Sequence, residues 1–100
     1  MTSIDPSITR EKINLETSKM PWSELQRFFA SGMAVFVTAD LDLVEVAFQF
    51  SQDNKVAVET WMNAHKIGVV SDEQAQDWSE KEAVLWAVVV KPWILVQDKE

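Results

Sequence analysis

His65 is the only histidine of the chain, so it is the first candidate for acid–base or metal chemistry near neutral pH. A metal site around it would depend on carboxylates, because the sequence has no cysteine. Glu59 lies nearly two helical turns away, too far to share an ion with His65 on one helix. At the predicted end of a helix, beside Lys66, His65 is better interpreted as a residue that ends the helix and interacts with its dipole. We keep His65 as an acid–base candidate and assign no catalytic residue and no metal ligand.

A run of carboxylates is the second candidate. Its members are Asp72, Glu73, Asp77, Glu80 and Glu82. The run lacks the alternating Asp or Asn ligands, the glycine and the closing glutamate of a calcium loop. We interpret it as the solvated face of a helix, and a docking face for a basic partner is the alternative.

Other catalytic patterns are missing from the sequence. The two glycines, Gly32 and Gly68, stand alone and form no phosphate-binding loop. No serine lies in the context of a nucleophile elbow. The chain has sixteen acidic residues, and nothing selects two of them as a hydrolytic pair. We therefore expect no cofactor and assign no cofactor-binding residue.

Tryptophan is unusually frequent, with five in a chain of 100 residues. Trp22, Trp61 and Trp78 fall at apolar positions of predicted helices, and the other two lie in the last apolar run. Core packing is the first interpretation. Tryptophan is also enriched where proteins bind partners, so some of these side chains are candidate interface anchors. The first choice is Trp93, together with Leu95.

Charge and hydropathy exclude several classes of partner. The formal net charge of −7 disfavours binding to a phosphate backbone, which needs clustered Lys and Arg. No apolar run approaches the roughly 18–20 residues of a membrane helix. The first residues lack the charged and then apolar pattern of a signal peptide. We expect a cytoplasmic protein without a nucleic-acid or membrane partner.

The elements that would position these residues begin with two helices. Asp5-Pro6 predicts the entry of a surface helix over 7–20, with Asp as N-cap and Pro at the first helical position. The apolar residues of 22–29 recur at helical spacing, and Gly32 follows where a left-handed helix end is expected. The short apolar stretch 33–38 is rich in β-branched and aromatic residues and predicts a buried strand.

The middle of the chain shows helical spacing over 42–50. The pair Asp42 and Glu45 has the form of a capping box, which favours a helix over a strand there. A helix over 55–65 and a short strand over 67–70 follow. The sequence Ser71-Asp-Glu-Gln74 is a second capping box and starts the last helix.

The stretch AVLWAVVVKPWILVQ, residues 83–97, is the strongest strand signal. Such a run predicts a central parallel strand covered by helices on both faces. Pro92 cannot donate to a strand ladder, so the strand is expected to bulge or to reach a sheet edge at Lys91-Pro92. We expect a bulge, which would place Trp86 and Trp93 on the same face, and we expect WILVQ to lie near a sheet edge.

These elements predict a fold of the α/β (α+β) class. The expected sheet is a small single-layer mixed or parallel sheet of three to four short strands, packed with about five helices. We expect residues 1–12 to form an N-terminal tail and the start of a helix. Residues 13–100 would form a single globular domain.

Four stretches of the chain carry a resemblance to a known family. They are ETSKMPWSELQRFFASG, LDLVEVAFQF, SDEQAQDW and LWAVVVKPWILVQ. Over about residues 13–97 the chain resembles a bacterial family of uncharacterised proteins, domain-of-unknown-function family 2288. The resemblance implies a small bacterial cytoplasmic protein, and it carries over no activity, cofactor or site residue.

Two functions of different classes remain open from the sequence. The first is a non-enzymatic protein–protein interaction or regulatory module that self-associates. The second is a small-molecule-binding domain or minimal enzyme that uses His65 and carboxylates. For the first, a free edge at WILVQ would present Trp93 and Leu95 on one face, and we expect a homodimer at micromolar concentrations.

Overall fold

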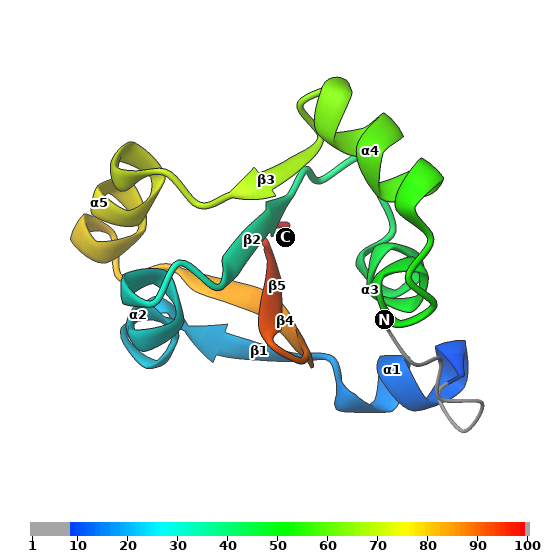
Figure 1. Ribbon diagram of the computed structural model, residues 1–100. Coiled ribbons are helices and arrows are strands. Elements are labelled where there is room, and N and C mark those ends of the chain that lie inside the picture. The colour runs from blue at the N-terminus through cyan, green and yellow to red at the C-terminus, as the bar shows by residue number, and fades with distance from the viewer. Residues whose placement is uncertain (1–8, 100) are drawn as a thin grey trace.

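The computed structural model of the chain describes residues 9–99 and contains one five-stranded sheet with helices on both faces (Figure 1). Its elements are α1 (Arg10–Glu16), β1 (Ser18–Pro21), α2 (Trp22–Ala30), β2 (Ala34–Val37), α3 (Leu43–Ser51), α4 (Lys55–Asn63), β3 (Ile67–Val69), α5 (Asp72–Glu80), β4 (Val84–Val90) and β5 (Trp93–Gln97). The strand order is β1-β4-β5-β2-β3, in which β2 and β5 are parallel and the other neighbours are antiparallel. The predicted class and mixed sheet are confirmed, with five strands where three to four were expected.

The first predicted helix is shorter than expected and is followed by a strand. The predicted entry at Asp5-Pro6 lies outside the described residues. Within them, α1 begins after Thr9, whose hydroxyl accepts from the Lys12 N–H at 3.1 Å. The segment Ser18–Pro21, which we expected to be helical up to residue 20, pairs antiparallel with β4. Such a short stretch ending in proline has little strand preference of its own, so the partner strand decides its conformation.

The apolar run over 83–97 forms a hairpin instead of one parallel strand. β4 and β5 pair antiparallel, and the cis peptide Lys91-Pro92 lies in the turn between them. β5 also pairs with β2 on its other side, so it is the middle strand of the sheet. The predicted edge position of WILVQ is therefore wrong. Trp86 and Trp93 do lie on the same face, as predicted, because the chain turns back on itself and not because of a bulge.

Each face of the sheet has its own apolar core. We call them the α2/α5 face and the α3/α4 face after the helices that cover them, and α1 also packs on the second (Figure 1). Buried on the α2/α5 face are Trp22, Leu25, Trp78, Leu85 and Ile94. Buried on the α3/α4 face are Ile13, Leu43, Val46, Val88 and Leu95.

Four helices end in the same backbone motif, with one residue in the left-handed region. These residues are Gly32, Asp53, His65 and Glu82, with φ of 75°, 54°, 59° and 48°. In each case the next N–H bonds back to a carbonyl of the last turn, as from Lys66 N to Trp61 O at 2.9 Å. The left-handed conformation predicted at Gly32 is confirmed, and this motif directs the chain from each helix into the next element.

Candidate functional site

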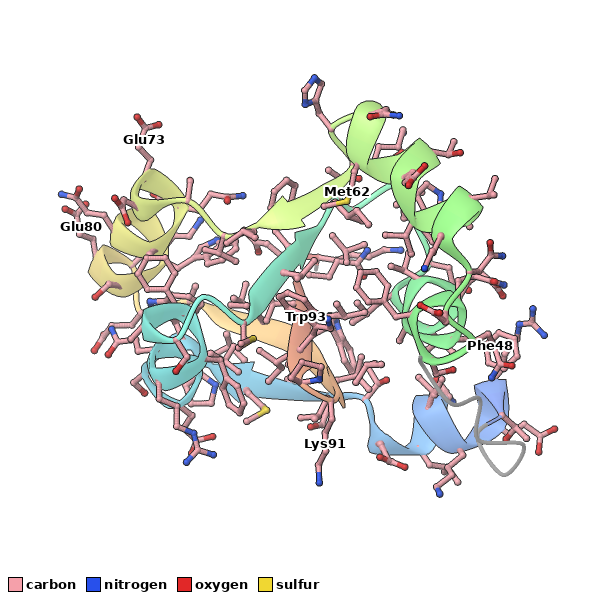
Figure 2. All side chains as sticks on the ribbon, in the orientation of Figure 1. Phe48, Met62, Glu73, Glu80, Lys91 and Trp93 are labelled. Carbon is pink, nitrogen blue, oxygen red and sulfur yellow. The ribbon has the colours of Figure 1, made fainter. Side chains whose placement is uncertain are left out.

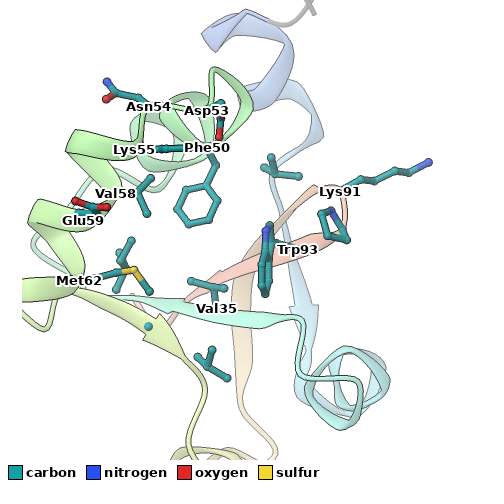
Figure 3. Close-up of a pocket in the computed structure, with 15 residues that line it drawn as sticks. Val35, Phe50, Asp53, Asn54, Lys55, Val58, Glu59, Met62, Lys91 and Trp93 are labelled. Atoms are coloured by element: carbon teal, nitrogen blue, oxygen red, sulfur yellow. The ribbon is translucent and has the colours of Figure 1, made fainter. Parts of the chain in front are cut away.

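The α3/α4 face is incompletely covered, and an apolar pocket of about 470 Å³ opens beside α4 (Figure 3). Its lining comes from β2, the end of α3, α4, β3 and the β4–β5 hairpin. The main apolar side chains are Val35, Phe50, Val58, Met62, Val69 and Trp93. A pocket of this size can hold a small molecule or an apolar side chain of another protein.

Two aromatic side chains form opposite walls of the pocket. Phe50 projects from the last turn of α3, and Trp93 is the first residue of β5 after the Lys91-Pro92 turn (Figure 3). Both rings are partly buried, so each keeps surface to offer to a bound group.

The corner between α3 and α4 sets the position of the pocket's helical wall. Asp53 ends α3 in the left-handed region. Asn54 then caps α4, because its side-chain oxygen accepts from the Ala57 N–H at 3.2 Å and its amide donates to Gln49 Oε1 at 2.8 Å. The fixed corner holds Val58 over the pocket.

Charged side chains surround the mouth of the apolar pocket. Asp53, Lys55, Glu59 and Lys91 line it and are all exposed. The ion pairs found within residues 9–99 involve other side chains. The rim therefore offers both signs of charge to a bound partner.

Titratable groups with shifted pKa values lie away from this pocket. A hydrogen bond from Lys66 lowers the pKa of the Asp40 carboxyl to about 2. A hydrogen bond from Arg10 lowers the pKa of Glu45, and the Arg10 guanidinium also lies 4.2 Å from the centre of the Phe48 ring. These are surface contacts that join elements of the fold, so their pKa shifts do not indicate an acid–base site in the pocket.

A second hollow lies near the C-terminal end of β5 and measures about 610 Å³. Asp40, Trp86 and Gln97 are among its lining residues. The Gln97 side chain is buried, and its amide donates to Thr38 O at 2.8 Å and to Leu41 O at 2.7 Å. Because these donors are already used within the protein, Gln97 fixes the loop after β2 instead of facing a ligand.

His65 lies outside the apolar pocket. It follows α4 as an exposed left-handed residue, and its N–H bonds to Met62 O at 3.0 Å, which confirms that it ends the helix. No group of three or more His, Cys, Asp or Glu within residues 9–99 could hold a metal ion. The structure therefore brings no carboxylate cluster to His65.

The other predicted site residues fall in three different environments. Trp93 lines the apolar pocket, whereas Leu95 is completely buried under the α3/α4 face and cannot contact a partner in this fold. The acidic run lies on α5 and just after it, where Glu73 and Glu80 point away from the molecule (Figure 2). Of the two predicted interface residues, only Trp93 is available at the surface.

Comparison with known proteins places the chain in a family. The family model described as "Protein of unknown function (DUF2288)" matches residues 8–98. The chain belongs to this family. The resemblance drawn from the sequence is thus confirmed. The match includes all of α1, whereas the predicted boundary between tail and domain, after residue 12, falls inside that helix.

A solved structure has the same fold as this chain. The NMR solution structure of PA1075 from Pseudomonas aeruginosa is 36% identical to this chain, with a TM-score of 0.81. The likeness covers 98% of this chain and 93% of that one. The comparison with curated proteins gave no match.

Most of the pocket of this DUF2288 chain could not be found from the sequence. The sequence points to Trp93, but nothing in it distinguishes Phe50, Val58, Met62 and Val69 from core residues of their helices and strands. Their common signal is apolar character, which core residues share, and only the fold leaves these particular ones partly uncovered.

Among the described residues, no helix is long and apolar enough to cross a membrane.

Proposed function

We propose that this chain is a non-enzymatic protein-binding module of the bacterial cytoplasm, and that the apolar pocket receives an apolar side chain of its partner. The observation that carries the proposal is the pocket itself, with Trp93 and Phe50 as its walls. Aromatic and methionine side chains around a hollow are typical of the centre of a protein interface.

The exposure of the pocket's outer wall favours a protein partner. Met62 is 47% exposed and Val69 is 54% exposed, so apolar surface continues beyond the hollow. Pockets for small molecules usually enclose most of their ligand. A protein that inserts one side chain would also cover this outer surface and meet the rim charges, such as Lys55 and Glu59.

A small-molecule-binding domain is the second candidate, and the two aromatic walls of the pocket, Phe50 and Trp93, favour it, because a small apolar ligand would contact both rings. The form of this candidate that uses His65 as an acid–base group has no support from the pocket, which His65 does not line.

The test compares two exposed positions on the same helix. A photo-crosslinking amino acid replaces Met62, which lines the pocket, or Val56, which is 77% exposed and does not line it. Both variants are produced in the cells from which the chain comes, and the products of illumination are identified by mass spectrometry. We expect a specific protein adduct from position 62 and little from position 56.

Other outcomes would reject the proposal. Equal adducts from both positions would show non-specific contact along α4. No protein adduct at position 62, together with a small-molecule mass on the wild type that is absent from Met62→Glu in native mass spectrometry, would favour the second candidate.

A further inference from the structure

The backbone of β3 has unpaired groups at the end of the sheet. β3 pairs with β2 on one side and forms the sheet edge opposite β1 (Figure 1). The bonds from Thr38 N to Lys66 O at 2.9 Å and from Val70 N to Ala34 O at 3.0 Å fix which residues of this antiparallel ladder face β2. Because facing alternates along the ladder, the N–H and C=O groups of Ile67 and Val69 point away from β2, towards the free edge.

The two edges of the sheet differ in their protection. β1 carries Lys19 and ends in Pro21, and both residue types discourage a further strand from pairing. β3 has the sequence Ile-Gly-Val, with no charge and no proline, and Val69 is 54% exposed on it. An unprotected apolar edge is a template for another strand.

We propose that β3 is the interface of a homodimer, in which the β3 strands of two copies pair antiparallel about a two-fold axis at Gly68. In this register Ile67 of one copy lies opposite Val69 of the other, and the outward N–H and C=O groups of both residues are paired. The sheet then continues through both copies. Gly68 has no side chain at the axis. A Cβ atom at this position would lie 2.9 Å from the Phe36 ring, which already fills that space.

Charges at the two ends of β3 complement each other in this register. Lys66, which also pairs with Asp40 of its own copy, precedes the strand. In this register it lies opposite Val70 of the second copy, close in sequence to the second copy's Asp72 and Glu73. Both carboxylates are exposed, and neither belongs to an ion pair found within residues 9–99. The net charge of −7 opposes association of two copies, so local attraction of opposite charges is what this edge requires.

This inference rests on the backbone of β3 and not on the proposed function, but the two share the Val69 side chain. Dimerisation would also cover part of the exposed Val69 side chain, which lines the apolar pocket. The sequence predicts the dimer contact at WILVQ, but that strand is central in the sheet. The contact proposed here is made by β3, which has a free edge.

The test measures the molar mass of the purified chain by sedimentation equilibrium up to about 500 μM, together with three variants of one residue each. Val69→Pro removes an outward N–H that the monomer does not use. Val69→Lys places a charge at the edge without changing the backbone. In the control, Val84→Lys, the same charge replaces a valine that is also 54% exposed but lies on β4, away from β3.

We expect a wild-type dimer whose dissociation constant rises at least tenfold in Val69→Pro and Val69→Lys and stays unchanged in Val84→Lys. Thermal melting of each variant checks that the monomer fold is kept, and Val69→Lys decides the question if Val69→Pro does not fold. A wild type that stays monomeric at the highest concentration would overturn the proposal. A folded Val69→Lys that dimerises as the wild type does would overturn it as well.

Discussion

The two faces of the sheet use tryptophan in different ways. On the α2/α5 face, Trp22 and Trp78 are 2% and 6% exposed, and their rings meet edge to face with centroids 5.1 Å apart. On the α3/α4 face, Trp61, Trp86 and Trp93 are only partly buried, and an open pocket remains beside Trp93. Both faces have a buried apolar core, and the second also keeps apolar surface that a partner can cover.

The arrangement of the helices explains this difference. α2 and α5 pack against each other across their face, so Trp22 and Trp78 fill the space between them. α4 packs on α3 and β3 and leaves the hairpin end of the sheet uncovered. An aromatic side chain is therefore buried on one face and stays accessible on the other, although its chemistry is the same.

The largest predicted effect tests whether the α3/α4 face is a true core beneath its helices. Val88 is 2% exposed under this face, so Val88→Asp places an unpaired charge in an apolar core. We expect a loss of several kcal/mol in the free energy of unfolding, seen as insoluble or unfolded protein.

The neighbouring residue is the matched control. Val89 is 47% exposed on the same strand, and Val89→Asp should stay soluble and melt close to the wild type in circular dichroism. A folded Val88→Asp with a normal melting temperature would contradict the burial of this strand.

The next prediction compares one tryptophan from each face. Trp22→Ala should lower the free energy of unfolding by about 3–5 kcal/mol, because it leaves a large cavity between α2 and α5. Trp93→Ala should cost less than half of that, roughly 1–1.5 kcal/mol, since it removes a wall that already faces solvent. Urea denaturation measures both, and equal losses would show that the two faces do not differ as described.

The smallest predicted effects come from substitutions at the helix ends. They should not depend on which face of the sheet the helix covers. His65 ends α4 and Glu82 ends α5, each in the left-handed region that favours glycine. His65→Gly should raise the free energy of unfolding by about 0.5–1 kcal/mol. Glu82→Gly should gain slightly more, because it also removes a negative charge from the negative end of a helix dipole.

Denaturant midpoints of the two glycine variants provide the check. Replacement of Gly32, which is already left-handed at φ 75°, by alanine should have the opposite sign and serves as the control. A loss of stability in His65→Gly would mean that its side chain makes a contact that outweighs the backbone strain.

The sequence by itself determined the features that depend on neighbours along the chain. Asp42 and Ser71 cap their helices as predicted, because a cap needs only the next few N–H groups. The capping box at Ser71 and Gln74 is formed in full. At Asp42, however, the Glu45 carboxylate binds Arg10 and Gln49 and does not complete the box.

Only the tertiary structure decided the features that join distant segments. The run over 83–97 has the same apolar pattern as one strand or as two, and the turn at Lys91-Pro92 together with pairing to β2 makes WILVQ central. β1 exists because β4 offers it an edge. The pocket brings together Val35, Phe50 and Trp93 from three elements, and the two aromatic rings are left partly uncovered above the buried Val35. Local sequence preference cannot specify such a pocket, because the pocket depends on where α4 ends relative to the sheet.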